Sequence, residues 1–213
     1  MPRLYWLKNK AVLKFGNHPE EFLKNFSTNT LDSPKNAFVN IEGRIVATFD
    51  QIVLENGDVQ VVMERPFVGR LKNHLDRYIK LTDATLEETE ANVYMDLNKD
   101  PKPIITREKL EACAPDSEFT LFRLKNNLPV QGIDYDEEML LNLDDENFIS
   151  YTKGCYLGQE VVARVRFRSK PPKKLVVKFE AECTQDESLR MTSKALDLRT
   201  GKTLGFVFVR NEG

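Results

Sequence analysis

The sequence predicts an α+β fold that is rich in short strands. Short segments of apolar and β-branched residues recur along the chain, and turn-forming residues separate them. Only a few segments carry apolar residues at helical spacing. The chain has 213 residues, of which 41% are hydrophobic, so it is long enough to bury a sizeable core.

The first quarter of the chain predicts a hairpin followed by a helix. Residues 5–7 and 11–15 are strand-like and flank the polar stretch Lys8-Asn9-Lys10, which we interpret as their turn. The helix begins near Pro19, because proline suits a first helical turn. Its residues Phe22, Leu23 and Phe26 would form one apolar face.

Further strands and one longer helix are predicted up to residue 103. Asn56-Gly57 predicts a sharp hairpin between the strands before and after it. Apolar residues at helical spacing follow Pro66, and the polar residues 98–103 read as a loop. The strands expected in this part are 37–41, 45–54, 59–63, 85–89 and 93–97.

The second half of the chain carries two opposite charge runs. Residues 134–146 hold seven acids and no base, and residues 164–174 hold six bases and no acid. A short helix is expected over 118–125, and Pro171-Pro172 marks a domain boundary. Short strands are expected over 175–179, 189–192 and 204–209.

Composition limits the classes of function. The formal charge is −2, which gives no global field for nucleic acid or membranes. No segment approaches the ~18 apolar residues of a membrane span, and we expect no export signal. The cysteines at 113, 155 and 183 have no metal-type spacing, so we expect no metal site and a reducing, cytoplasmic setting.

The segment from Lys153 to Glu160 carries the strongest chemical signal. Gly154 and Gly158 permit a tight backbone around Cys155, and a short helix is expected from residue 158. A helix N-terminus and a nearby lysine both favour a thiolate, which is the reactive form of cysteine. The alternative is a purely structural turn. A nucleophile pair with His18 or His74 is a weaker alternative, because neither histidine is near in sequence.

Residues 151–165 closely resemble the signature of the YgfZ family, folate-binding proteins related to the T-protein (aminomethyltransferase) of the glycine cleavage system. The segments 22–29, 42–47 and 122–134 resemble other parts of these proteins. The resemblance implies a multi-lobed T-protein-like folate-binding fold with mixed or antiparallel sheets. It implies a folate-binding region over 1–170, in two intertwined lobes, and a short C-terminal β-barrel-like lobe over 171–213.

The resemblance also implies a function and a site. The expected function is a folate-binding accessory protein that supports iron–sulfur cluster assembly or repair in client enzymes, with Cys155 as the key thiol. Tetrahydrofolate or a derivative is the expected cofactor, and iron–sulfur client or assembly proteins are the expected partners. The residues expected to bind the cofactor are Lys153, Tyr156, Gln159, Glu160, Arg164, Asn142, Arg44 and Asn29.

Two alternatives remain open. The first is a folate-dependent aminomethyltransferase-like one-carbon transferase. The resemblance places the catalytic aspartate of the T-proteins at Ala47 or Thr48, and neither residue is a carboxylate. Asp50 is two residues beyond Thr48, which is ~7 Å along a strand, so it does not take the place of that aspartate. A tRNA-binding or tRNA-modifying protein is the second. On a strand, Arg164, Arg166 and Arg168 would share one basic face.

Overall fold

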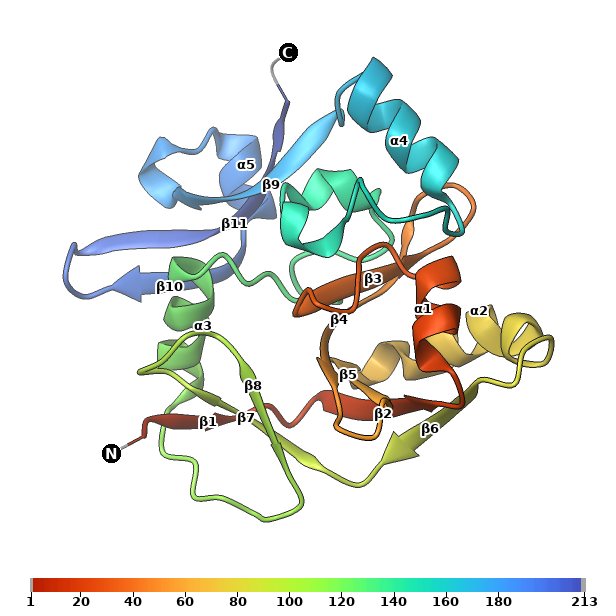
Figure 1. Ribbon diagram of the computed structural model, residues 1–213. Helices are drawn as coiled ribbons and strands as arrows, with labels where there is room; N and C mark the ends of the chain where they lie inside the picture. Colours follow the sequence, from red (N-terminus) through yellow and green to blue (C-terminus); the bar gives the residue numbers. More distant parts are fainter. Residues whose placement is uncertain (1, 212–213) are drawn as a thin grey trace.

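A five-stranded antiparallel sheet forms the centre of the computed structural model, which describes residues 2–211 (Figure 1). Its strand order is β3-β4-β5-β2-β6. The Asn56-Gly57 turn joins β4 to β5 as the sequence predicts. The strands are β2 (Lys10–Gly16), β3 (Lys35–Val39), β4 (Ile45–Val53), β5 (Val59–Glu64) and β6 (Thr85–Thr89).

Both faces of this sheet are covered, and strand alternation decides what each face contacts. One face packs on α1 (Pro19–Phe26) and α2 (Val68–Ile79) through a cluster that includes Leu13, Phe22 and Leu71. Val12, which points to the other face, packs with residues of a second sheet. Side chains at even positions of β2 and β5, and of β4 from Thr48 onward, therefore face away from the two helices.

The second sheet has the order β1-β7-β8, with β1 (Leu4–Trp6), β7 (Asn92–Asp96) and β8 (Pro103–Thr106). The predicted hairpin between residues 5–7 and 11–15 is wrong, because β1 pairs with β7. Both edges of β2 are already taken by β5 and β6. The polar turn after β1 therefore carries the chain from one sheet to another.

The third sheet, β10-β11-β9, lies at the C-terminal end and is open within the described residues. Three strands are too few to close, so the expected barrel-like lobe is corrected to an open sheet. Its strands are β9 (Lys173–Phe179), β10 (Thr192–Asp197) and β11 (Lys202–Arg210). The strand expected over 189–192 is wrong. A capping box between Thr184 and Glu187 starts the helix α5 (Gln185–Arg190) there instead.

Two more helices connect these sheets. α3 (Asp116–Lys125) packs beside β10, and α4 (Gln159–Arg168) follows the signature segment (Figure 1). α4 corrects the strand interpretation of its arginines. Positions two apart on a helix point in nearly opposite directions, so Arg166 does not share a face with Arg164 and Arg168.

Candidate functional site

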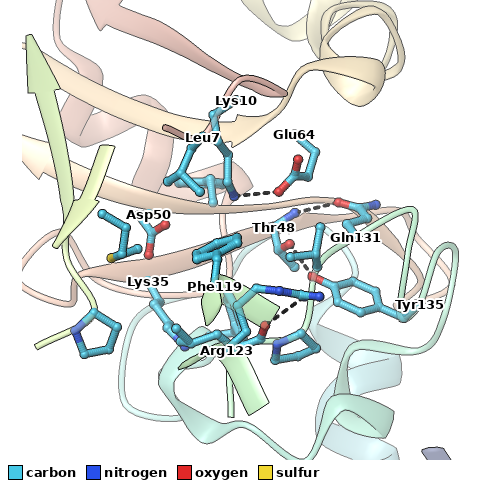
Figure 2. A pocket seen from close by; sticks show the side chains of 17 residues that line it. Leu7, Lys10, Lys35, Thr48, Asp50, Glu64, Phe119, Arg123, Gln131 and Tyr135 are labelled. Atoms are coloured by element: carbon cyan, nitrogen blue, oxygen red, sulfur yellow. Dashed lines mark hydrogen bonds and ion pairs between the residues drawn. The ribbon is translucent and has the colours of Figure 1, made fainter. Parts of the chain in front are cut away.

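A central cavity of about 80 Å³ lies between β4, the start of β2 and the segment 128–135 (Figure 2). Apolar side chains and a few charged groups form its wall. Its charged residues are Lys10, Lys35, Asp50, Glu64 and Arg123. Apolar and aromatic side chains such as Leu7, Phe119 and Phe148 complete the wall. Nine of the 17 lining residues are apolar and eight are polar or charged, and the cavity is smaller than the roughly 300–1,000 Å³ of a typical small-molecule site.

Most polar groups in the wall have partners. Lys10 Nζ lies 2.8 Å from a carboxylate oxygen of Glu64, its cross-strand neighbour. Thr48 Oγ1 and the Tyr135 hydroxyl are 2.5 Å apart, and Gln131 accepts a hydrogen bond from the Thr48 amide. Burial raises the pKa of Tyr135, so this hydroxyl stays protonated. These contacts hold one side of the cavity in a fixed geometry.

Asp50 is different, since its carboxylate has no hydrogen-bond or ion-pair partner among the described residues. It lies beside Lys35 in the β3–β4 register. Lys35 is bound to Asp145 at 3.1 Å. Burial raises the pKa of Asp50, while the positive charges of Lys10 and Lys35 act against this rise. Asp50 is thus an unpaired acid at the cavity wall.

A second cavity of about 350 Å³ adjoins the central one. Lys8, Asp116 and Ile133 belong to its wall, on the side of β1 and α3. Six residues line both cavities: Leu7, Lys10, Glu64, Phe119, Arg123 and Val130. A ligand longer than the central cavity could extend past Phe119, whose ring stacks on Tyr5 at a centroid distance of 4.0 Å.

The signature segment lies outside these cavities. Cys155 is exposed, three residues before Gly158, which is the N-cap of α4. Tyr156 is buried in an apolar cluster, and Glu160 and Arg164 are exposed. Gln159 is partly buried, and none of these residues lines the central cavity. The structure therefore places the thiol on an accessible loop at the surface.

The Lys153 ammonium group is engaged by the backbone. It donates hydrogen bonds to the carbonyl oxygens of Leu23, Ser27 and Asn29 at 3.3, 2.7 and 2.9 Å. Burial, and then the like charge of Lys24, lower its pKa to about 8. Lys153 thus stabilises the C-terminal end of α1, where unpaired carbonyls carry partial negative charge.

Gly158 has a packing role at the start of α4. Its φ is +82°, and an added Cβ would lie 2.3 Å from the Asn40 carbonyl oxygen. Only glycine allows this contact, which brings α4 against the turn between β3 and β4. The glycine therefore fixes the direction in which the helix leaves the signature loop.

The remaining residues expected to bind a cofactor are scattered. Arg44 is exposed and donates to the Glu137 carbonyl. Asn142 is buried outside the central cavity, donates to Glu138, and leaves its own side-chain oxygen without a partner. Asn29 is buried, and its amide donates to backbone carbonyls such as that of Asn147. These three residues do not share one site with Cys155.

A short segment nevertheless connects the signature loop to the cavity. Lys153 binds the carbonyls of Ser27 and Asn29, on either side of Thr28. The Thr28 hydroxyl donates a 2.6 Å hydrogen bond to the carbonyl of Phe148, which lines the cavity. Two hydrogen-bonded steps thus link the backbone of Phe148 to the signature loop.

Sequence reasoning missed the charged cavity residues Lys10, Lys35 and Glu64, and set Asp50 aside. The available signal was the even-position alternation of charged residues along β2, β4 and β5, which places them on one face. Ala47 is buried on the opposite face, and Thr48 carries only a hydroxyl. Neither residue supplies the carboxylate that the resemblance to T-proteins leads one to expect at this position.

A groove of about 670 Å³ lies between the acidic residues 144–146 and the C-terminal end of α4. Arg166 bridges it through a 2.6 Å ion pair with Glu146, and packs over the ring of Tyr151. Phe167 is 72% exposed between Arg166 and Arg168. An aromatic ring flanked by cations is thus present on this surface.

The comparisons confirm the resemblance noted in the sequence. A 31-residue stretch is 61% identical to the tRNA-modifying protein YgfZ of Colwellia psychrerythraea, and covers 15% of this chain and 10% of that relative. No protein-family model matches. The structure matches the glycine cleavage system aminomethyltransferase T from Bartonella henselae with a TM-score of 0.73 and 11% identity, covering 97% of this chain and 78% of that one.

The structural match shows that the chain has the T-protein fold. Within residues 2–211, no helix is long and apolar enough to cross a membrane. No group of three or more histidine, cysteine or acidic residues in the same range is arranged to hold a metal ion.

Proposed function

We propose that this chain is a folate-binding accessory protein that supports iron–sulfur cluster assembly or repair in client enzymes, with Cys155 as the key thiol. The observation that carries the proposal is the hydrogen-bonded connection between the Cys155 loop and the wall of the central cavity. The T-protein fold and the short match to a YgfZ protein support the same assignment.

The cavity suits a reduced folate in its chemistry. A pterin ring presents flat faces and several N–H donors, and the wall offers aromatic side chains and the unpaired Asp50 carboxylate. The p-aminobenzoate and glutamate parts of the ligand would extend past Phe119 into the second cavity. Lys8 and Lys10 there supply positive charge for the glutamate carboxylates.

The exposed thiol suits contact with a partner protein. Cys155 is accessible, so a client or a cluster-carrying protein can reach it without unfolding the loop. Occupation of the cavity would press on Phe148 and alter the loop through Thr28 and Lys153. Folate binding would thereby control the presentation of the thiol.

Three measurements test this function. Calorimetric titration with 5-formyltetrahydrofolate should show binding, and saturating ligand should raise the melting temperature. Ligand should also change the alkylation rate of Cys155, measured by peptide mass spectrometry. Cys113, an exposed thiol bound to Arg3, is the internal control and should react at an unchanged rate.

The role of the thiol is tested in cells that lack their own folate-binding accessory protein. Cys155→Ser should fold normally and fail to restore iron–sulfur enzyme activity, whereas Cys113→Ser should restore it. Full rescue by Cys155→Ser would contradict the proposed role of this residue. An absence of folate binding to the wild-type chain would contradict the proposed cofactor.

RNA binding is a second candidate, favoured by the exposed Phe167 between Arg166 and Arg168 on α4. Aromatic rings stack on bases, and cations bind phosphates. Phe167→Ala should weaken tRNA binding, and the affinity should fall steeply with salt. An affinity that does not change with salt would argue against this surface.

A further inference from the structure

The groove of about 670 Å³ beside α4 carries opposite charges on its two walls. One wall is the acidic segment 144–146, and the other is the end of α4 with the residues that follow it. The basic residues of this second wall are Arg166, Arg168 and Lys170. The apolar lining includes Ile149, Tyr151 and Phe167. A partner that complements the groove must therefore carry both signs of charge together with an apolar contact.

Several of these charges have no partner within the chain. Among residues 2–211, Asp144, Arg168 and Lys170 form no ion pair. Arg166 binds Glu146 at 2.6 Å, and both side chains are exposed to solvent. An exposed ion pair contributes little to stability, so its two members can exchange this contact for an equivalent one at little cost.

The surroundings of Arg166 show which group the basic wall binds. Its guanidinium carbon lies 5.2 Å from the centroid of the Tyr151 ring, and this ring meets the Phe167 ring edge-on at 6.0 Å. Stacking on an aromatic ring orients the planar guanidinium group, whose N–H donors match a carboxylate. The bound carboxylate of Glu146 shows that an acidic side chain fits this position.

Phe167 supplies the apolar contact. Its side chain is 72% exposed, although the residue belongs to a helix. Aromatic and arginine side chains are enriched at the centres of protein interfaces, where they enter pockets of the partner. The groove is several times larger than a phenylalanine side chain, so it can admit one from a second molecule.

We propose that this groove is the interface between two copies of the chain, related by a two-fold axis. Such an interface brings the same surface of both copies together, so the acidic wall of each copy faces the basic wall of the other. Glu146 of each copy binds the partner's Arg166, in place of the pair within the chain. Phe167 of each copy enters the groove of the other.

Two consequences distinguish this interface from the function proposed above. The acidic wall repels a phosphate backbone, so a groove of both signs fits a second copy better than RNA. The interface lies apart from the central cavity and does not depend on folate binding. The inference therefore goes beyond the proposed function and stands or falls without it.

Analytical ultracentrifugation of the full chain at increasing protein concentration tests the interface. Wild type should form a dimer, and the dimer should weaken with added salt, because salt screens exposed ion pairs. Phe167→Ala, Arg166→Glu and Glu146→Arg should each weaken self-association by at least ~10-fold, since a two-fold axis doubles every change. Arg190→Glu is the matched control, because Arg190 forms an exposed pair with Asp186 outside the groove.

An equimolar mixture of Arg166→Glu and Glu146→Arg gives the sharpest result. In the mixed dimer both crossing contacts again join an acid to a base, so the mixture should associate although neither variant does so alone. The double variant with both changes should dimerise like wild type. Circular dichroism should show that every variant is folded.

Wild type that stays monomeric at every concentration overturns the inference and needs no variant. A mixture of the two charge variants that fails to associate overturns it as well. If monomeric wild type binds tRNA and Phe167→Ala abolishes this binding, the surface serves RNA and the inference is also overturned.

Discussion

The ammonium nitrogen of Lys153 lies 2.7 Å from the carbonyl oxygen of Ser27, the C-cap residue of α1. This contact joins the signature loop to a helix that precedes it by more than a hundred residues. The lysine was expected to act on the neighbouring thiol or on a cofactor. In the structure its hydrogen bonds hold the loop against the end of α1. The position of Cys155, two residues away in the same loop, therefore depends on these bonds.

Lys153→Met should destabilise the fold by about 1–3 kcal/mol, because several carbonyls at the end of α1 lose a charged donor. The free energy of unfolding in urea measures this loss. Cys155 should also be alkylated faster, since its loop is released. Lys24→Met is the control, because the exposed Lys24 makes none of these hydrogen bonds. Equal stability of the two variants would contradict the bracing role.

Lys153 should also impart a pH dependence. Its pKa is lowered to about 8 in the folded chain, against an ordinary value of 10.5. Between these values the unfolded chain binds more protons, so the contribution of Lys153 to the free energy of unfolding rises with pH. Urea unfolding of wild type and Lys153→Met, from about pH 8 to about pH 10, isolates this contribution. An identical slope in both proteins would contradict it.

Local signals in the sequence predicted several elements of the fold correctly. Asn56-Gly57 specifies the β4–β5 hairpin, and the helical spacing after Pro66 specifies α2. These predictions succeed because a single turn or a single helix is determined by residues that are close together in the sequence. The partner of β1 could not be predicted, because strand pairing with β7 joins residues about ninety positions apart.

The candidate site was predictable to a smaller extent. The segment around Cys155 is contiguous, so it could be recognised directly. The cavity is assembled from β2, β4 and β5, and its charges meet only once the register places Lys10 opposite Glu64 and Lys35 opposite Asp50. Asp50 was set aside because of its distance along β4. That distance carries no information about the pairing of β4 with β3, which places Lys35 opposite Asp50.

Gly158→Ala should be strongly destabilising. The new Cβ would overlap the Asn40 carbonyl oxygen, and the backbone would keep a positive φ that alanine disfavours. We expect a loss of more than ~2 kcal/mol, measured by chemical denaturation. Gly154→Ala is the matched control within the same loop. Its Cβ would meet nothing nearer than Lys24 Cε at 3.8 Å, so its stability should stay within ~0.5 kcal/mol of wild type.

The ion pair between Arg123 of α3 and Asp134, which Ser193 of β10 joins, should be the most sensitive polar contact where α3 meets the C-terminal sheet. Their side chains are 6% and 0% exposed and lie 2.8 Å apart, and Ser193 of β10 contacts both. Arg123→Met leaves a buried carboxylate unpaired and should cost about 3–5 kcal/mol. Adding Asp134→Asn removes that uncompensated charge, so the double variant should lose less than the sum of the two single losses. Strictly additive losses in urea unfolding would show that the two residues act independently.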